Sequence, residues 1–543
     1  MAVDMLSGGR VQDAAGKGAA LAPDHHVVVV GAGIGGLVAA LLLASRGLRV
    51  TVVEAAAAPG GKMHQLRVDG VGIDAGPTVF TMRWVFEQIL AQAHASLDDL
   101  PPMTPLSLLA RHAWRGQEKR LDLYADTARS TQAIGEFAGA AEARRFQGFC
   151  LQARRVLAHL EAPYIRRGRP TLWSMGRELG PAGLGVLAGL GPFNSLWRTL
   201  GRHFHHPQLR QLFARYATYC GASPWQAPAT LMLVAQVELD GVWSVQGGMH
   251  GLACAMARLA ESRGAIFRYA APCAQVLTRD GRARGVRLAS GEELAADAVL
   301  FNGDPQALVQ GLLGPDVMSA VPAVPRARRS LSAITWAMNV AAPDWPLARH
   351  NVFFEDDYAA EFEDIFKHRR LPQRGTVYVC AQDRGDDATA PAGGNDRLLC
   401  LVNAPPDGDR RPFDLQETEP CTRQSLDLLR SCGLALAPQP HQQQCTTPAH
   451  FAQRFAATGG ALYGQATHGW MSAFRRPGSG TAVPGLFLAG GGVHPGPGVP
   501  MAALSGQQAA AALMDSLVST SRWRRGPTSG GMSTPSATTA ATR

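Results

Sequence analysis

The stretch Val27–Gly61 reads VVVVGAGIGGLVAALLLASRGLRVTVVEAAAAPGG and decides the fold of this chain. Its β-branched start, Val27–Val30, predicts a buried strand, and the glycine-rich turn GAGIGG follows at residues 31–36. A helical pattern comes next, and a second predicted strand, Val50–Val53, ends in the acid Glu54. This order of strand, GxGxxG turn, helix, strand and acid is the fingerprint of a dinucleotide-binding βαβ unit.

Each element of the fingerprint has a physical role. Gly31 permits the tight turn after the strand, and Gly33 lets backbone N–H groups approach a pyrophosphate. Gly36 allows close packing of the helix on the sheet, while the helix N-terminus faces the anion. Glu54 can accept hydrogen bonds from both hydroxyls of the adenosine ribose, and its charge would repel the 2′-phosphate of NADP. The alternatives are another glycine-rich βαβ turn or a membrane span, which four glycines within residues 27–44 disfavour.

Two segments after the acid favour a flavin over a nicotinamide. Pro59-Gly60-Gly61-Lys62 directly follows the second strand, and it resembles the glycine pair that lines FAD in flavoproteins with two dinucleotide-binding domains. Further on, Asp74-Ala75-Gly76-Pro77-Thr78 is a small, turn-rich segment whose backbone can pack against a ring or a ribityl chain. A surface turn is the alternative interpretation of this second segment.

The bulk composition indicates a protein of two or more domains that handles apolar material. The 543 residues exceed one simple core, and 46% are hydrophobic while only 17% are charged. Nine cysteines without a CxxC pair argue against a disulfide framework and a zinc site, and they indicate a reducing compartment. We expect no metal site and no serine–histidine–acid triad. The start of the chain lacks the apolar core of a signal peptide.

The net charge of +9 is not distributed as in a nucleic-acid-binding protein, and no nucleic-acid partner is expected. Much of it lies between Arg154 and Arg215, around the apolar run Gly180–Leu190 with Trp173 and Phe193 on either side. Basic and aromatic residues together suit peripheral docking on an anionic lipid surface, here the cytoplasmic side of a membrane. The run is too short to form a transmembrane helix. A lid helix with a solvated basic face is the alternative.

The sequence predicts an α/β fold: a Rossmann-type FAD-binding domain assembled from three segments, with an inserted α+β domain that faces substrate and membrane. The expected order is a disordered lead (1–23), a first FAD-binding segment (24–105), a mainly helical substrate segment (106–238), a second FAD-binding segment (239–308), a mixed substrate segment (309–455), a third FAD-binding segment (456–518) and a flexible tail (519–543). A weakly patterned polar stretch lies near Gln382–Asp396.

The second and third FAD-binding segments also carry strand and loop signals. The second opens at Gly247-Gly248-Met249, continues through alternating strands joined by tight turns, and ends with the buried strand Ala298–Asn302. In the third, Gly485–Gly490 is a strand that enters a loop of glycine and proline, and an alanine-rich helix follows at about Met501–Leu517. Such a loop lets backbone lie against a flat ring. The helix that begins near Pro500 would direct its positive end at the negative charge of a reduced flavin.

These segments, in this order, resemble the phytoene-desaturase family of FAD-dependent carotenoid oxidoreductases over about residues 26–518. Within it, Asp74–Phe86 and Tyr463–Met471 are most similar to the hydroxycarotenoid 3,4-desaturases, also called methoxyneurosporene dehydrogenases. The resemblance implies an acyclic carotenoid substrate and desaturation of the C3–C4 bond beside a 1-hydroxy or 1-methoxy end group. The expected FAD-binding residues are Gly31, Gly33, Ile34, Gly35, Gly36, Glu54, Gly60, Gly61, Lys62, Gly76, Pro77, Thr78, Val276, Asn302, Gly490, Gly491, Val499, Pro500 and Met501.

The reaction that the resemblance implies needs a hydride acceptor more than a strong base. Flavin N5 would take the hydride, and a weak acceptor would take the proton made acidic by the polyene cation. We therefore expect a long apolar tunnel, with quinone or oxygen as the electron acceptor. The polar residues in the matching motifs are Arg83, His64, His468 and His494, which are weak candidates for binding the substrate hydroxyl or relaying a proton. Structural hydrogen bonding is the alternative role for each.

Three alternative functions remain open from the sequence. The first is a phytoene-type desaturase that acts earlier in the same pathway. The second is a non-catalytic escort of isoprenoid-modified proteins built on the same fold, which would bind FAD weakly or not at all. The third is a flavin amine oxidase, which would need an aromatic cage that the sequence does not reveal.

Overall fold

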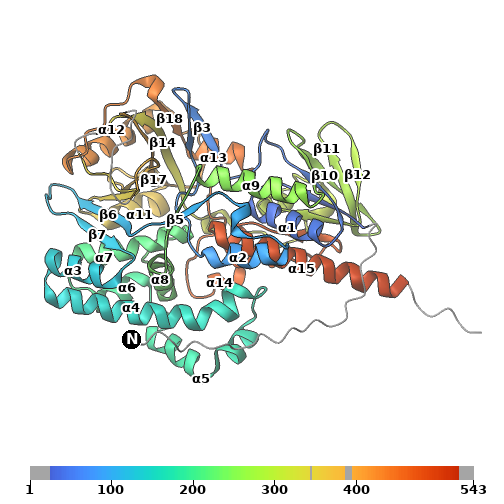
Figure 1. Ribbon diagram of the computed structural model, residues 1–543, viewed down its shortest axis with the longest axis horizontal. Coiled ribbons are helices and arrows are strands. Elements are labelled where there is room, and N and C mark those ends of the chain that lie inside the picture. Colours follow the sequence, from blue (N-terminus) through green and yellow to red (C-terminus); the bar gives the residue numbers. More distant parts are fainter. Residues whose placement is uncertain (1–24, 192, 343–344, 386–393, 525–543) are drawn as a thin grey trace, which may run out of the picture.

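The computed structural model describes residues 25–191, 193–342, 345–385 and 394–524. The expected disordered lead, residues 386–393 of the polar stretch and residues 525–543 of the expected tail lie outside the described residues. Figure 1 shows two halves side by side: one around α1, α9 and α15, and one around β14, β17 and the helices beneath them.

A five-stranded parallel sheet forms the centre of the first half. Its strand order is β19-β13-β1-β2-β9, and neighbouring strands run parallel throughout. These strands come from three distant stretches of the chain, which confirms the predicted α/β Rossmann-type fold. Their bounds are β1 (His26–Val30), β2 (Arg49–Val53), β9 (Ile266–Arg268), β13 (Ala298–Phe301) and β19 (Leu486–Leu488).

Alternation along β1 divides the side chains between two layers, because successive residues of a strand point to opposite faces. Val27 and Val29 pack into the core formed with helices α1 (Ile34–Ser45), α9 (Gly248–Ser262) and α15 (Val499–Arg524). Val28 and Val30 instead pack against the three-stranded antiparallel sheet β10-β11-β12. The parallel sheet is therefore covered on both faces, as its continuous apolar strands require.

The antiparallel sheet contains the tight turns that the sequence predicts. Its strands are β10 (Cys273–Arg279), β11 (Arg282–Leu288) and β12 (Glu293–Ala295). Asp280 and Gly281, which join β10 to β11, both have positive φ, at 53° and 69°. Two consecutive residues of this kind form the type I′ turn, whose twist matches a two-residue hairpin.

The second half is built on a seven-stranded sheet of order β18-β14-β17-β16-β15-β6-β7. Two of its strands, β6 and β7, lie within residues 106–238, where the sequence predicts mainly helix and neither strand was expected. β6 runs parallel to β15, with Val352 opposite His112. The strands are β6 (Leu108–Trp114), β7 (Leu121–Tyr124), β14 (Ser332–Val340), β15 (His350–Phe354), β16 (Val377–Ala381), β17 (Asp396–Ala404) and β18 (Gln443–Thr446).

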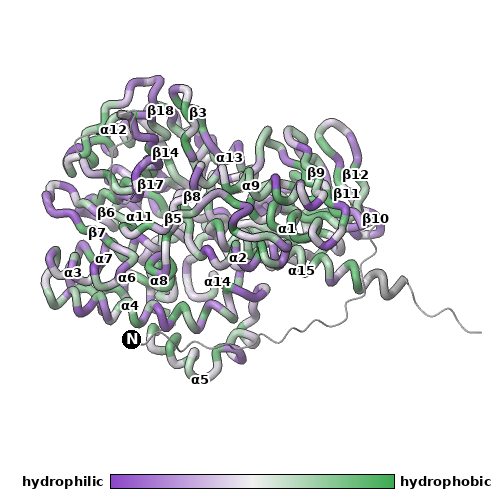
Figure 2. The backbone as a smooth tube through the Cα atoms, in the orientation of Figure 1, coloured by the Kyte–Doolittle hydropathy of each residue, from purple (hydrophilic) through white to green (hydrophobic). Residues whose placement is uncertain are grey.

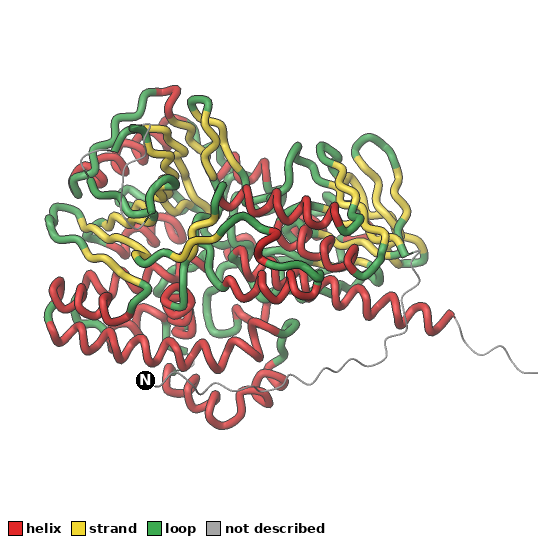
Figure 3. Tube along the Cα trace, in the orientation of Figure 1, coloured by secondary structure: helices red, strands yellow, loops and turns green. Residues whose placement is uncertain are grey.

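Helices cover both faces of this sheet (Figure 3). Those of the first inserted stretch are α3 (Thr127–Ala138), α4 (Ala140–Leu160), α5 (Leu172–Leu190), α6 (Leu196–His203), α7 (Pro207–Ala214) and α8 (Leu233–Leu239), with the π-helix η2 (Glu161–Arg166) and the 3₁₀ helix η3 (Arg215–Cys220). On the opposite face lies α12 (Leu415–Ser431). Within the described ranges, no helix combines the length and the apolar character needed to cross a bilayer.

Shorter elements complete the fold around the two large sheets. They are β3 (Gln65–Val68), β4 (Val71–Asp74), α2 (Arg83–Gln92), η1 (Leu97–Asp99), β5 (Met103–Pro105), η4 (Ala229–Met232), β8 (Trp243–Val245), α10 (Gln306–Val309), η5 (Pro315–Val317), η6 (Arg326–Arg328), α11 (Tyr358–Phe362), η7 (Glu363–His368), η8 (Pro440–Gln442), α13 (Pro448–Arg454) and α14 (Ser472–Arg475). In α5, Gly180 has a φ of 59°, which kinks the helix directly before Pro181.

Gly36→Ala tests the close packing at the start of α1. A Cβ at Gly36 would lie 2.2 Å from the backbone oxygen of Gly31, so the turn would have to shift. We expect this variant to lose about 1–3 kcal/mol of unfolding free energy and most of its bound flavin. Gly148→Ala is the control, because this exposed glycine of α4 has open space around it and alanine favours the helix. Wild-type denaturation and flavin content in Gly36→Ala would contradict the prediction.

Candidate functional site

The glycine-rich turn after β1 packs directly around one side chain, Asn302, at the end of β13. The Asn302 amide nitrogen donates a hydrogen bond to the backbone oxygen of Gly31 at 3.3 Å. A Cβ at Gly33 or at Gly35 would lie only 2.7 Å from the Asn302 side chain. Glycine is therefore required at both positions by the asparagine that holds the turn, and not only by a ligand.

The acid at the end of β2 fixes the same turn from its other side. Glu54 accepts hydrogen bonds from the backbone N–H of Ala32 at 2.6 Å and of Ala56 at 2.8 Å. The segment after it folds back onto the turn, because Gly60 donates its N–H to the Ala32 oxygen at 2.8 Å. Gly60 has a φ of 119°, and a Cβ there would overlap the backbone of Met63. Local backbone contacts thus hold the first two glycine motifs together.

Buried polar side chains fix the glycine–proline loop that follows Gly490 by hydrogen bonds to its backbone. Ser505 of α15 accepts a hydrogen bond from the Gly490 N–H at 2.7 Å. Arg476 donates to the backbone oxygens of Tyr463 at 3.1 Å and of Gly491 at 3.2 Å. Burial lowers the pKa of Arg476 from its ordinary value. These contacts fix the loop next to the first residues of α15.

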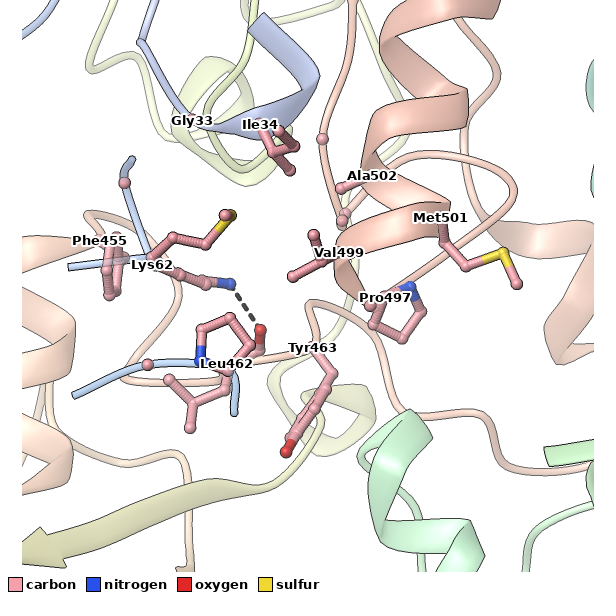
Figure 4. Close-up of a pocket in the computed structure, with 18 of the residues that line it drawn as sticks. Gly33, Ile34, Lys62, Phe455, Leu462, Tyr463, Pro497, Val499, Met501 and Ala502 are labelled. Atoms are coloured by element: carbon pink, nitrogen blue, oxygen red, sulfur yellow. Dashed lines mark hydrogen bonds between the residues drawn. The ribbon is translucent and has the colours of Figure 1, made fainter. Parts of the chain in front are cut away.

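All three motifs meet at one cavity of about 980 Å³. Figure 4 shows Gly33 and Ile34 at the start of α1, Val499 at the start of α15, and Lys62 across the pocket from Val499. The Lys62 ammonium donates a hydrogen bond to the Leu462 oxygen at 2.5 Å, and burial lowers its pKa from the ordinary value. We call the region of the cavity lined by the glycine motifs, Glu54 and Asn302 the dinucleotide groove.

The cavity continues from the groove into the second half of the molecule. One face of the seven-stranded sheet lines it there, together with η3, α8 and the aromatic residue Tyr463. We call this region the inner chamber, and its lining residues are Thr78, Arg215, Tyr219, Leu231, Leu233, Val234, Val237, Glu238, Thr335, Tyr358, Thr376, Tyr378, Leu399, Leu401, Asn403 and Tyr463. Aliphatic side chains alternate with a few buried polar groups. Such a chamber suits a long apolar molecule with a limited polar function.

The residues of the groove fit FAD. The N-cap of α1, Gly33, has no side chain to cap the helix, so its first N–H groups are free to bind a pyrophosphate. The Asn302 side-chain oxygen is buried and has no hydrogen-bond partner among the described residues. The start of α15 faces the same cavity through Val499 and Pro500. Two helix N-termini and a wall made largely of glycine backbone are what a dinucleotide with an attached flat ring requires.

Nearly all the expected FAD-binding residues line this cavity. The exceptions are Gly36 and Val276. Gly36 lies one turn into α1, where it contacts the Gly31 oxygen, as its predicted packing role requires. Val276 is fully buried in the core between the two sheets, and Pro272 and Cys273 line the cavity in its place. The strand was identified correctly, but the residue that reaches the cavity lies at its beginning.

The weak catalytic candidates are placed differently from one another. His64 lines the cavity, whereas Arg83, His468 and His494 do not. Arg83 is paired with Glu87 at 2.9 Å on the surface of α2. His468 accepts a hydrogen bond from the Ser223 N–H at 3.0 Å, and His494 contacts the Arg167 oxygen at 3.0 Å.

Burial lowers the pKa of His64, His468 and His494 to about 4 in each case, so all three are neutral near pH 7. The contacts of His468 and His494 support the alternative role of structural hydrogen bonding. Among the described residues no cluster of side chains could hold a metal ion.

The polar residues of the inner chamber were not predicted from the sequence, above all Arg215, Tyr219, Glu238 and Tyr378. Burial is the first cause of the raised pKa of Glu238. An acid within the apolar run 229–239 is the one signal that could have revealed it. Arg215 gives no such signal, because the surrounding sequence is rich in arginine.

Comparison with known proteins supports the flavin site. The family model "Flavin containing amine oxidoreductase" matches residues 34–514. A hydroxyneurosporene desaturase of Rubrivivax gelatinosus is 64% identical over 95% of this chain and 98% of its own length. That of Cereibacter sphaeroides is 44% identical over 91% and 99%. The structure of an oxidoreductase from Methanosarcina mazei shares the fold with a TM-score of 0.57 at 15% identity, over 90% of this chain and 100% of that one.

The neutral histidines predict how stability depends on pH. The pKa of His468 is about 4 in the folded protein, below the value of about 6.5 in an unfolded chain, so protons bind preferentially to the unfolded state between these values. Stability is therefore complete above about pH 6.5 and falls as the pH drops toward 4. We expect thermal denaturation of His468→Gln to show a weaker loss over this range than wild type, because the glutamine oxygen can still accept from Ser223. His441→Gln, at an exposed position, should follow wild type; equal slopes for all three proteins would contradict the prediction.

Proposed function

Because the chain belongs to the family of flavin-containing amine oxidoreductases, we infer that it is an FAD-dependent carotenoid desaturase. It introduces a C3–C4 double bond into acyclic carotenoids that carry a 1-hydroxy or 1-methoxy end group. The observation that carries this conclusion is the single cavity in which the dinucleotide groove opens into the inner chamber. The two hydroxyneurosporene desaturases, which match nearly the whole chain, support the same substrate class.

The alternative functions are not favoured. The relatives are named for hydroxylated carotenoids rather than phytoene. The groove retains every glycine motif of a flavin site, which an escort protein without cofactor would not need. An amine oxidase takes a cationic substrate, and the guanidinium of Arg215 in the chamber wall would repel it.

The chain's own residues position the substrate and exclude water. FAD, when bound in the groove, supplies the acceptor for the hydride that the substrate loses. Leu399 and Leu401 of β17 and Leu233 and Val237 of α8 give the chamber its apolar walls. Such walls keep water from a cation that develops on the polyene, and they hold the C3–C4 bond over the groove. A weak proton acceptor is sufficient, and His64 is the neutral imidazole that lines the cavity.

The exposed aromatic residues around α5 support peripheral membrane association. Trp173 is 73% exposed and Phe193 is 80% exposed, and Phe193 contacts Trp470 with ring centroids 6.2 Å apart. Trp470 lies between Thr467 and Ser472, the first residue of α14, and both of these line the cavity. Figure 2 shows α5 coloured largely from white to green, which marks its apolar character. The patch therefore lies next to a wall of the cavity, where an apolar substrate would leave the lipid.

Quinone or oxygen is the proposed final electron acceptor. Glu54 lies at the end of β2, where its charge disfavours the 2′-phosphate of NADP. A quinone shares the lipid phase with the carotenoid, so the same entrance could serve both.

Co-expression tests the proposed function directly. In cells that accumulate 1-hydroxylated acyclic carotenoids, the chain should shift the pigment absorption to longer wavelength, because the new C3–C4 double bond extends the conjugated system. Gly36→Ala, with its disturbed flavin turn, serves as the inactive control. An unchanged spectrum in these cells, combined with desaturation of phytoene, would assign the earlier step instead.

Vesicle binding tests the membrane surface. The double variant Trp173→Glu and Phe193→Glu should lose most of its cosedimentation with anionic lipid vesicles. It replaces two aromatic side chains that would insert into the lipid by two carboxylates that the anionic headgroups repel. The matched control is Leu415→Glu, which changes an equally exposed residue (71%) of α12 and should bind as wild type does. Equal binding of all three proteins at equal flavin content would remove this surface from the proposal.

A further inference from the structure

Three strands of the seven-stranded sheet place a row of side chains on the chamber side. Thr335 of β14 pairs with Leu401 of β17, and Leu401 pairs with Tyr378 of β16. Side chains opposite one another in a sheet share a face, so these three point the same way. All three line the chamber, whereas Trp336, one residue further along β14, packs into the core on the other face. The sheet thus presents Tyr378 to the chamber at the β16 end of this row.

Tyr378 connects the chamber to the flavin segment. Its hydroxyl is 2.7 Å from the Thr78 hydroxyl and 2.7 Å from Nδ1 of His350. Thr78 belongs to the Gly76-Pro77-Thr78 turn that lines the groove. A group that contacts Tyr378 therefore lies close to the position where the isoalloxazine ring is expected.

Arg215 is that group. Its guanidinium carbon is 5.2 Å from the centre of the Tyr378 ring and 5.2 Å from the centre of the Tyr219 ring. Within the described residues of the chain, its side chain makes one hydrogen bond, from Nη1 to the Tyr219 hydroxyl at 3.1 Å, and no ion pair. A guanidinium carries five N–H donors. Arg215 therefore has donors left over, and it presents them in the chamber.

A nearby acid holds this arrangement without pairing with the guanidinium. Glu238 of α8 accepts hydrogen bonds from the hydroxyls of Tyr216 and Tyr219, the latter at 3.3 Å. Burial lowers the pKa of Arg215, but Tyr219, Tyr378 and Glu238 outweigh it, so the pKa is raised overall and the charge is kept. A carboxylate has about four lone-pair sites, so Glu238, which also lines the chamber, can accept a further hydrogen bond.

A pure hydrocarbon cannot satisfy these groups. Buried charged donors left without partners cost more than neutral ones, and an oxygen that accepts from them recovers that cost. A tertiary hydroxyl can accept from a guanidinium and donate to a carboxylate at once. In the substrate class of the proposed function, this oxygen is carried by C1, and only C2 separates that carbon from the reacting C3. The group that binds this oxygen must therefore lie near the flavin, and Arg215 contacts Tyr378, whose hydroxyl is 2.7 Å from the Thr78 hydroxyl.

We propose that Arg215, held in place by Tyr219 and Glu238, binds the oxygen of the carotenoid end group and selects oxygenated substrates over hydrocarbon ones. The proposal rests on the proposed desaturase function and adds the residue that sets its specificity. A site built to hydrogen-bond an oxygen rejects the analogue that lacks it, because its own polar groups are then left unpaired.

The test compares two substrates in the purified, FAD-loaded full-length protein. One is a 1-hydroxylated acyclic carotenoid, and the other is the same polyene with hydrogen in place of the hydroxyl. Arg215→Met keeps an unbranched apolar stem at this position and removes the guanidinium with its donors. We expect kcat/KM for the hydroxylated carotenoid to fall by about 10- to 100-fold, mainly through KM, while kcat/KM for the hydrocarbon is unchanged or rises. Bound FAD per protein should equal that of wild type.

Matched variants make the outcome decisive. Arg210→Met removes another arginine that stacks on an aromatic ring, that of Trp197 at 3.9 Å, and because Arg210 does not line the cavity it should keep the wild-type preference. If Arg215→Met does not fold, Arg215→Lys and Tyr219→Phe decide, and each should lower the preference by a smaller factor. A variant with wild-type FAD content and the wild-type preference would overturn the proposal. A wild-type protein that binds FAD but desaturates neither polyene would instead overturn the proposed function.

Discussion

The structure depends on the contact between one asparagine, Asn302, and the glycine-rich turn at residues 31–36. Asn302, at the end of β13, donates a hydrogen bond to the Gly31 oxygen and leaves no room for a Cβ at Gly33 or Gly35. This contact joins the first strand of the chain to a strand that is made about 270 residues later, and Gly490 of the third stretch lies against the same asparagine. The cofactor groove is built from three distant segments, and its binding groups are mostly backbone atoms. One residue that contacts all three segments fixes the positions of those atoms relative to one another.

The features that were predictable from the sequence are those fixed by local patterns. Val27–Val30 followed by GAGIGG predicts a buried parallel strand and a helix N-terminus, since β-branched runs and glycine turns have few other stable arrangements. The hairpin at Asp280-Gly281 was predicted for the same reason. Val276 shows the limit of this approach. Its strand was recognised, but the Val276 side chain packs into the core between the two sheets, and that packing is set by tertiary structure.

The inner chamber was not predictable, because its polar groups are brought together only by tertiary structure. Arg215 lies within a basic segment, and no local pattern distinguishes it from solvent-exposed neighbours such as Arg202. Its burial follows from the packing of η3 against the sheet face that carries Tyr378. The strands β6 and β7 were also missed: β7 pairs only with β6, while β6 pairs on its other side with β15, about 240 residues away, and the sequence that follows β7 is largely helical. Local sequence motifs thus determine the dinucleotide groove, whereas the tertiary structure determines which side chains line the chamber.

The parallel pairing of β6 with β15 has a consequence for how the protein is made. Arg111 leaves the ribosome long before Asn351, its partner in the ladder, and the central sheet waits still longer for Leu486–Leu488. At the usual rate of translation, about 5–20 residues per second, β6 has only β7 and β1 has only β2 as a neighbour for tens of seconds. Neither half can complete its folding on the ribosome before the other is nearly synthesised. The apolar edges of both sheets are therefore covered only late in synthesis, which is the stage at which incomplete sheets associate wrongly.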